Sequence, residues 1–149
     1  MSIQDQITND IKAAMKAKDS DKLSALRLVK SAIMLEATKD GRRSVSDEIS
    51  LKIISKLVKQ RKDSASIYVE QNRHDLADDE LNQAMHIESY LPKQMNENEV
   101  LTVVQKVIHE EGASSISDMG KCMPRLMSML NGKADGKLIS RIVKDELSK

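Results

Sequence analysis

The chain has 149 residues with 24 basic and 23 acidic side chains, so its formal net charge of +1 gives no long-range field and any nucleic-acid contact must come from a local patch. Phe and Trp are absent and only two Tyr occur, which argues against the aromatic platforms on which sheet-based single-strand binders stack bases. One cysteine excludes an internal disulfide and a cysteine-based zinc site, and no apolar run is long enough to span a membrane.

Two amphipathic helices are predicted at the N-terminal end. Apolar residues at three- and four-residue spacing indicate a helix over 3–15, with Ser2 as its N-cap. A second helix follows the capping cluster at 19–21 and ends at 40–41, where a glycine takes the left-handed conformation without strain. It carries two apolar stripes, so we expect it to be central in its domain. Residues 42–45 then form a loop.

A third and a fourth helix complete the first half. The third begins after a serine cap at Ser44 or Ser46 and continues until the apolar pattern breaks near Asn72. The fourth opens at Asp75 and is closed by Pro92, because the residue before a proline is pushed out of helical geometry.

Three further helices are predicted over 96–112, 117–131 and 135–147. Pro124 falls inside the second of them, where it removes a backbone donor and should kink or split the helix. No stretch alternates with a period of two, so the fold class is all-α.

The helices group into two predicted domains. Residues 1–92 form a four-helix N-terminal domain and residues 96–149 a three-helix C-terminal tail domain, with 93–95 as the linker.

No catalytic, metal or cofactor site is predicted. The three histidines occur singly, and Cys122 has the spacing of a core residue, so we interpret it as a buried, inert thiol. No phosphate-binding glycine loop or nucleophile elbow is present, which disfavours an autonomous enzyme. The N-terminus lacks a signal-peptide core, so we expect a cytoplasmic protein with no membrane contact. The nine methionines are interpreted as core filler, with an adapter surface as the alternative.

Basic residues near the C-terminus form a candidate phosphate-binding surface. Lys137, Arg141 and Lys144 fall on one side of the last helix, opposite its apolar side. Before them, Lys133 lies in a glycine-bracketed turn that delivers a helix N-terminus, where free N–H groups favour a phosphate. The alternative is an ordinary pair of helix caps beside a solvated lysine face. From residue 113 onward there are seven basic and four acidic residues, so this part of the chain has a local surplus of positive charge.

A second set of basic residues, the lysines at positions 52, 56, 59 and 62, lies on the third predicted helix. It shares its side of that helix with acidic residues and is interpreted as a salt-bridged surface.

Two arginines are expected to be partly buried. Helical-wheel geometry puts Arg27 and Arg61 among apolar positions of the second and third helices. A buried guanidinium must be paired, so we expect either an ion pair between helices that supports the fold or the recognition of a ligand anion.

Six short runs, in this order and spacing, resemble the YqeY (GatB/YqeY-like) family of small bacterial proteins over essentially the whole chain. They are Asp21–Val29, Lys59–Ser64, Tyr90–Gln94, Gly112–Ser114, Asp118–Lys121 and Gly132–Gly136. The family is similar to the C-terminal helical and tail region of the B subunit of the tRNA-dependent amidotransferase, and the same module is appended to some glutaminyl-tRNA synthetases. The resemblance implies an all-helical, two-domain appendage that grips the outer corner of tRNA, and it adds Lys121 to the candidate contacts.

Three functions follow as hypotheses. The favoured one is a tRNA-binding accessory module without catalysis of its own, working beside amidotransferase or synthetase subunits. The second is a component of a glutamine-dependent carbon-nitrogen ligase, an aminoacyl-tRNA amidotransferase, which needs partners for the ATP-dependent step and for ammonia supply. The third is a helical protein-protein adapter that uses the methionine-rich tail.

Overall fold

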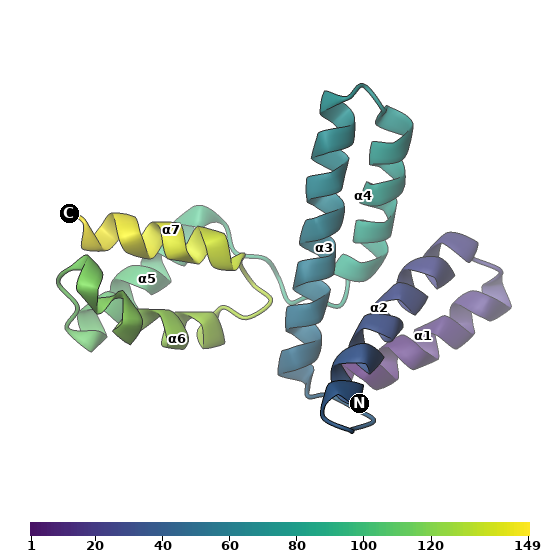
Figure 1. Cartoon of the computed structure of the whole chain (residues 1–149), viewed down its shortest axis with the longest axis horizontal. Coiled ribbons are helices and arrows are strands. Elements are labelled where there is room, and N and C mark those ends of the chain that lie inside the picture. Colours follow the sequence, from purple (N-terminus) through teal and green to yellow (C-terminus); the bar gives the residue numbers. More distant parts are fainter. The chain divides into compact units, whose positions relative to one another are not determined.

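The structure, a computed structural model, describes residues 1–149 and contains seven α-helices, one short 3₁₀ helix and no strand, which confirms the all-α class. The elements in chain order are α1 (Ile3–Ala17), α2 (Ser20–Lys39), α3 (Asp47–Glu70), α4 (His74–Glu88), α5 (Glu97–Glu111), η1 (Ile116–Asp118), α6 (Met119–Met129) and α7 (Gly136–Leu147) (Figure 1). They form two compact units, Met1–Leu91 and Pro92–Lys149. None of the helices combines the length and the apolar character that crossing a membrane requires.

Side-chain caps start most helices at residues that the sequence marks. The capping bonds run from Asp5 N to Ser2 Oγ (3.1 Å), from Lys22 N to Asp19 Oδ1 (3.2 Å), from Ile49 N to Ser46 Oγ (3.3 Å), from Glu99 N to Asn96 Oδ1 (2.9 Å) and from Lys137 N to Asp135 Oδ1 (3.2 Å). Each satisfies a backbone donor that has no partner inside the helix. Of the two serines proposed for the third helix, Ser46 is therefore the cap.

The start of α4 differs from the prediction. Arg73 is its N-cap and makes no side-chain capping bond. Asp75, the expected cap, lies inside the first turn, and its carboxylate accepts hydrogen bonds from the Arg73 guanidinium at 3.3 Å. Asp75 therefore pairs with the preceding arginine from inside the first turn and is not the N-cap.

The helix that contains Pro124 also differs. A 3₁₀ turn, η1, precedes it, and α6 then continues through Pro124 as one helix, so of the two expected effects, a kink or a split, the split is wrong. Proline removes only one bond of the helix ladder. Cys122 and Leu126, on either side of it, are fully buried, and this packing holds both halves of the helix in place.

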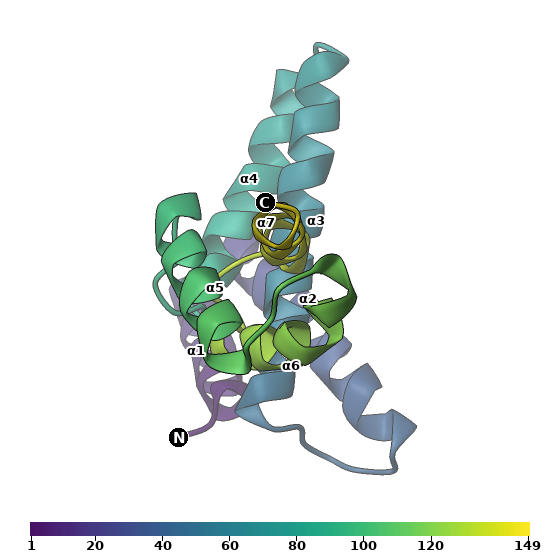
Figure 2. The ribbon, with the colours of Figure 1, turned by 90° about the vertical axis from the view of Figure 1, so that its left-hand side faces the viewer.

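The first unit is built on α2. This helix packs against α1, α3 and α4, while α4 lies beside the C-terminal part of α3 (Figures 1 and 2). The core consists of aliphatic side chains from all four helices: Ile7, Ile11, Ala25, Leu26, Val29, Ile33, Ile54, Val58, Ala84 and Ile87. The central position expected for α2 is thus confirmed, but part of its second apolar stripe stays at the surface, with Leu35 67% exposed.

The second unit is a three-helix arrangement in which α5, α6 and α7 each contact the other two; Figure 2 looks almost along the axis of α7. Its core is Val100, Val104, Val107, Cys122, Leu126, Leu130, Ile139, Ile142, Val143 and Leu147. Met95, Met119 and Met123 pack against this core, which agrees with their interpretation as filler. Burial raises the pKa of the Cys122 thiol, with a smaller contribution from Glu111.

The segment expected to be the linker is hydrogen-bonded to the second unit. Gln94 Nε2 donates to the carbonyl oxygen of Gly132 at 2.5 Å, and Met95 N donates to the carbonyl oxygen of Lys133 at 2.9 Å. We call these two bonds the linker clamp. The compact units meet at Leu91 and Pro92, one residue before the predicted boundary, and the independent folding of each unit stays a prediction.

We predict that the linker clamp protects Lys93 from trypsin. In the wild type, cleavage after Arg42 or Arg43, which are exposed in the loop between α2 and α3, should precede cleavage after Lys93. Gln94→Ala removes the side-chain bond and should accelerate the cut after Lys93 without changing the cut at the arginines. Mass spectrometry of a short digestion series measures both rates, and equal rates at Lys93 in the two proteins would contradict the role of the clamp.

A hydrogen bond joins the end of the first unit back to its beginning. The Tyr90 hydroxyl, just after α4, donates to the Asp10 carboxylate of α1. Burial, the hydrogen bond and the charge of Asp10 all raise the pKa of Tyr90, because they favour the neutral phenol.

Tyr90→Phe should lower the free energy of unfolding by about 1.5 kcal/mol at neutral pH, because the bond has a charged acceptor. Tyr68→Phe is the matched control, since the Tyr68 hydroxyl makes no hydrogen bond. The raised pKa stabilises the folded wild type below about pH 10, and this contribution is lost as the pH rises above that value. Urea titrations from pH 7 to 11 should therefore show the wild type and Tyr90→Phe converging; a constant difference would be evidence against the bond.

Candidate nucleic-acid interface

The turn between α6 and α7 fixes the start of the candidate surface. Gly132 has a φ of 75°, the left-handed conformation that a glycine adopts without strain. A Cβ added to Gly136 would lie 3.1 Å from Met127 Cε, so the turn approaches α6 closely. With the linker clamp on its other side, the backbone at Lys133 is held from two directions, while the Lys133 side chain is exposed.

A carboxylate already occupies the N-terminus of α7. Asp135 is the N-cap, and its side chain accepts from the backbone N–H of Lys137 at 3.2 Å. An anionic oxygen thus sits where a phosphate would have bound. The structure has the alternative that the sequence left open, a helix end followed by an ordinary N-cap, and we assign no phosphate site to this helix end.

The basic side chains of α7 lie on its solvent side. Lys137, Arg141 and Lys144, which we call the α7 stripe, are all exposed, and the opposite side of the helix buries Ile139 and Val143. Within the stripe, Lys137 and Lys144 form no ion pair. Arg141 differs, because its Nη2 donates to the Glu97 carboxylate of α5.

Other basic residues of the second unit are engaged with carboxylates. Lys121 lies on α6 and pairs with Asp118 at 3.4 Å. Hydrogen bonds from the N–H groups of Ser114 and Ser115, followed by Lys121, lower the pKa of that carboxyl. Arg125 of α6 pairs with two glutamates of α5. The surplus counted along the sequence therefore reduces to a few uncompensated lysines, those at positions 133, 137 and 144.

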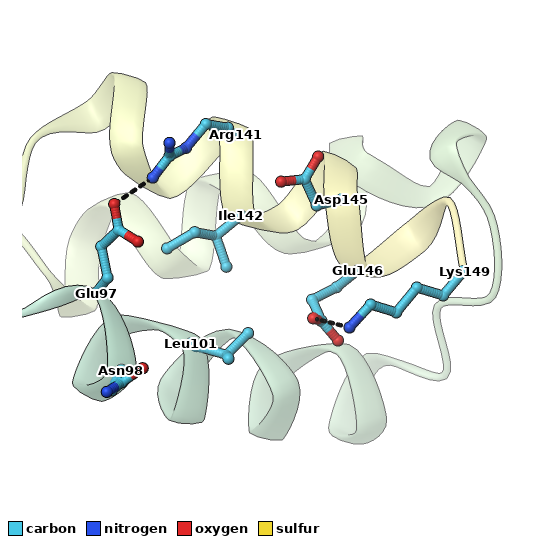
Figure 3. A pocket seen from close by; sticks show the side chains of 8 residues that line it. All are labelled: Glu97, Asn98, Leu101, Arg141, Ile142, Asp145, Glu146 and Lys149. Carbon is cyan, nitrogen blue, oxygen red and sulfur yellow. Dashed lines mark hydrogen bonds and ion pairs between the residues drawn. The ribbon is translucent and has the colours of Figure 1, made fainter.

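A groove runs beside the α7 stripe, between α5 and α7 (Figure 3). It has a volume of about 340 Å³, with Leu101 and Ile142 at its floor. Ion pairs stand at its two ends: Glu97 with Arg141 at one, and Glu146 with Lys149, at 2.8 Å, at the other. Three carboxylates and two cations line it, so the groove carries a slight excess of negative charge, which disfavours a phosphate there.

The described residues hold no group of three or more His, Cys, Asp or Glu side chains arranged to bind a metal. In the first unit, Lys52 reaches Glu48 at 4.0 Å and Lys62 reaches Glu88 at 2.8 Å, as expected for a salt-bridged face.

Arg27 and Arg61 do not form the ion pairs expected of them. Arg27 is exposed on α2, so its expected burial is wrong: the stripe that contains it is not covered by another helix. Arg61 is half-buried on α3, and its Nε atom is buried without a hydrogen-bond partner. The adjacent Lys62, rather than Arg61, takes the Glu88 carboxylate of α4.

Arg61→Met should raise the free energy of unfolding by about 1 kcal/mol, because it removes an unsatisfied buried donor and keeps the apolar stem. Arg27→Met, at an exposed position of the same unit, should leave stability unchanged within about 0.5 kcal/mol. Chemical denaturation compares the two variants with the wild type. A loss of stability in Arg61→Met would mean that the guanidinium has a partner.

Sequence reasoning missed three residues of this region. Lys93 is exposed and lies within the segment that the linker clamp ties to the turn, so this segment carries a further cation. Gln94 supplies the clamp, and Glu97 neutralises Arg141. The run that contains Lys93 and Gln94 was visible in the sequence, but its contact with the turn joins residues 38 positions apart.

A family model described as Yqey-like protein matches residues 4–147. Among curated relatives, altered inheritance of mitochondria protein 41, mitochondrial, from Vanderwaltozyma polyspora is 35% identical over 120 residues, which cover 76% of this chain and 64% of the relative. Proteins of the same name from Kluyveromyces lactis and Meyerozyma guilliermondii are 31% and 43% identical, over 66% and 57% of this chain and 55% and 44% of their own lengths.

The chain thus spans less than two thirds of the length of these curated relatives. They are yeast proteins with mitochondrial names, so a bacterial origin and a cytoplasmic location stay predictions for this chain. Because the family model covers nearly every residue, from the first turn of α1 to the last residue of α7, the chain belongs to the YqeY family.

Proposed function

We propose that the chain is a helical, tRNA-binding accessory module of the amidotransferase-associated kind, which acts by binding and not by catalysis of its own. The observation that carries the proposal is the set of exposed lysines at and after the α6–α7 turn, namely Lys133, Lys137 and Lys144, none of which has a carboxylate partner. Uncompensated cations on a rigid helix are the usual means by which proteins contact a phosphate backbone. Membership of the YqeY family and the resemblance to the amidotransferase tail support the same proposal.

Recognition in this proposal follows the shape and charge of the RNA. With no Phe or Trp and with both Tyr half-buried in the first unit, the chain has no stacking surface for unpaired bases. Contacts to phosphates position an RNA without reading its sequence. We therefore propose a structured target, the outer corner of tRNA, and amidotransferase or synthetase subunits as the proteins that supply any reaction.

One observation favours the adapter function as a second candidate. Met127 and Met129, at the end of α6, are each 40% exposed and are the flexible, polarisable side chains that adaptable protein interfaces use. The other methionines of this unit are packed against its core, so this surface is small.

Lys137→Glu/Arg141→Glu should abolish binding of total tRNA and leave the circular dichroism spectrum unchanged, because both side chains point away from the core. The control is Lys30→Glu/Lys56→Glu, which makes the same change in net charge at two exposed, unpaired lysines of the first unit. If attraction to RNA were a property of net charge alone, both variants would lose binding equally.

Salt dependence provides the second readout. Three lysines that each neutralise one phosphate predict a slope of log affinity against log salt of roughly −2 to −3, with micromolar affinity near physiological ionic strength. Fluorescence anisotropy with labelled tRNA at several salt concentrations measures it. A folded charge-reversal variant with undiminished affinity would reject the RNA proposal and favour the adapter function.

A further inference from the structure

One member of the α7 stripe is not free to meet a phosphate. Arg141 Nη2 donates to Glu97 Oε1, and this pair joins the first turn of α5 to the middle of α7 across 44 positions of sequence. Figure 3 shows the two side chains reaching toward each other at one end of the groove. Both remain largely exposed, at 57% for Arg141 and 65% for Glu97.

The surroundings of Arg141 add further negative charge. Asp145, one turn after Arg141, lines the same groove and has no ion-pair partner. Glu146 also lines it, but Lys149 and Gln105 engage its oxygens. An anion that approaches Arg141 from the groove side therefore meets carboxylates, whereas Lys137 and Lys144 are exposed and form no ion pair.

We propose that Glu97 competes with phosphates for Arg141 and must be displaced by a ligand, so that this surface accepts the phosphodiester backbone of a nucleic acid and rejects isolated phosphates. The inference rests on the proposed RNA binding and names a residue that sets its ligand class. An exposed ion pair is weak and exchanges readily, so displacement is feasible. A single phosphate gains only one contact in exchange for the pair it breaks and therefore has no net advantage.

A nucleic-acid backbone compensates for the lost pair elsewhere. Lys137 and Lys144 flank Arg141 and are separated by seven residues, about 10 Å along the helix axis at 1.5 Å per residue. Phosphates that contact both lysines hold the strand over Arg141, so the displacement of Glu97 becomes an intramolecular step with a high effective concentration. The preference for a nucleic-acid backbone over a single phosphate thus arises because two cations of the α7 stripe are unpaired and the third, Arg141, is paired with Glu97.

The test compares Glu97→Gln with Glu99→Gln. Both substitutions remove one negative charge from the first turn of α5, but the Glu99 side chain is exposed and makes no ion pair. Glu97→Gln should raise affinity for tRNA by about threefold, the scale of one exposed pair, because the phosphate no longer has to displace a carboxylate from Arg141. Glu99→Gln should have a clearly smaller effect.

A double-mutant cycle with Arg141→Gln tests whether the gain in tRNA affinity depends on Arg141. The increase caused by Glu97→Gln should disappear in the Arg141→Gln background, and inorganic phosphate should compete with tRNA more effectively on Glu97→Gln than on the wild type. Thermal melts confirm that all variants are folded. Equal gains in Glu97→Gln and Glu99→Gln, or a gain that persists without Arg141, would overturn the inference while RNA binding stands. If neither the wild type nor any variant binds tRNA at low salt, the proposed function itself fails.

Discussion

The burial of one aliphatic stripe on α7 determines where every charged group of that helix lies. Ile139, Val143 and Leu147 are enclosed by α5 and α6, so α7 cannot rotate about its axis without exposing them. Side chains half a turn away are consequently held in solvent, and those a quarter turn away reach the neighbouring helix. The exposed lysines and the pair between Arg141 and Glu97 are therefore two results of the same packing.

Helix positions could be read from the sequence because local signals decide them. Ser2, Ser46 and Asn96 cap helices through donors only three residues away, and such bonds depend on nothing else in the fold. Asp75 shows the limit of this approach. It has the right residue type for a cap, but it pairs with the preceding arginine from inside the first turn, and this outcome depends on side-chain geometry that a residue pattern does not contain.

The cations of the candidate site could be predicted from the sequence, but the carboxylates that pair with them could not. Spacing alone places Lys137, Arg141 and Lys144 on one side of a helix, and the structure has them there. The carboxylate that neutralises Arg141 lies on another helix, so only tertiary packing reveals it. The prediction for Arg61 was wrong for the converse reason. Its apolar neighbours predicted an ion-pair partner, but Lys62, and not Arg61, binds the Glu88 carboxylate of the facing helix.

Cys122 gives the second unit a chemical reporter of its own. It is the sole cysteine of the chain and is completely buried between α5, α6 and α7. Its raised pKa keeps the side chain in the protonated thiol form, which is less reactive than the thiolate. A thiol reagent can reach it only when the helices separate. The rate of alkylation in native conditions therefore reports the opening equilibrium of that three-helix core, while motions confined to the first unit stay invisible to the reagent.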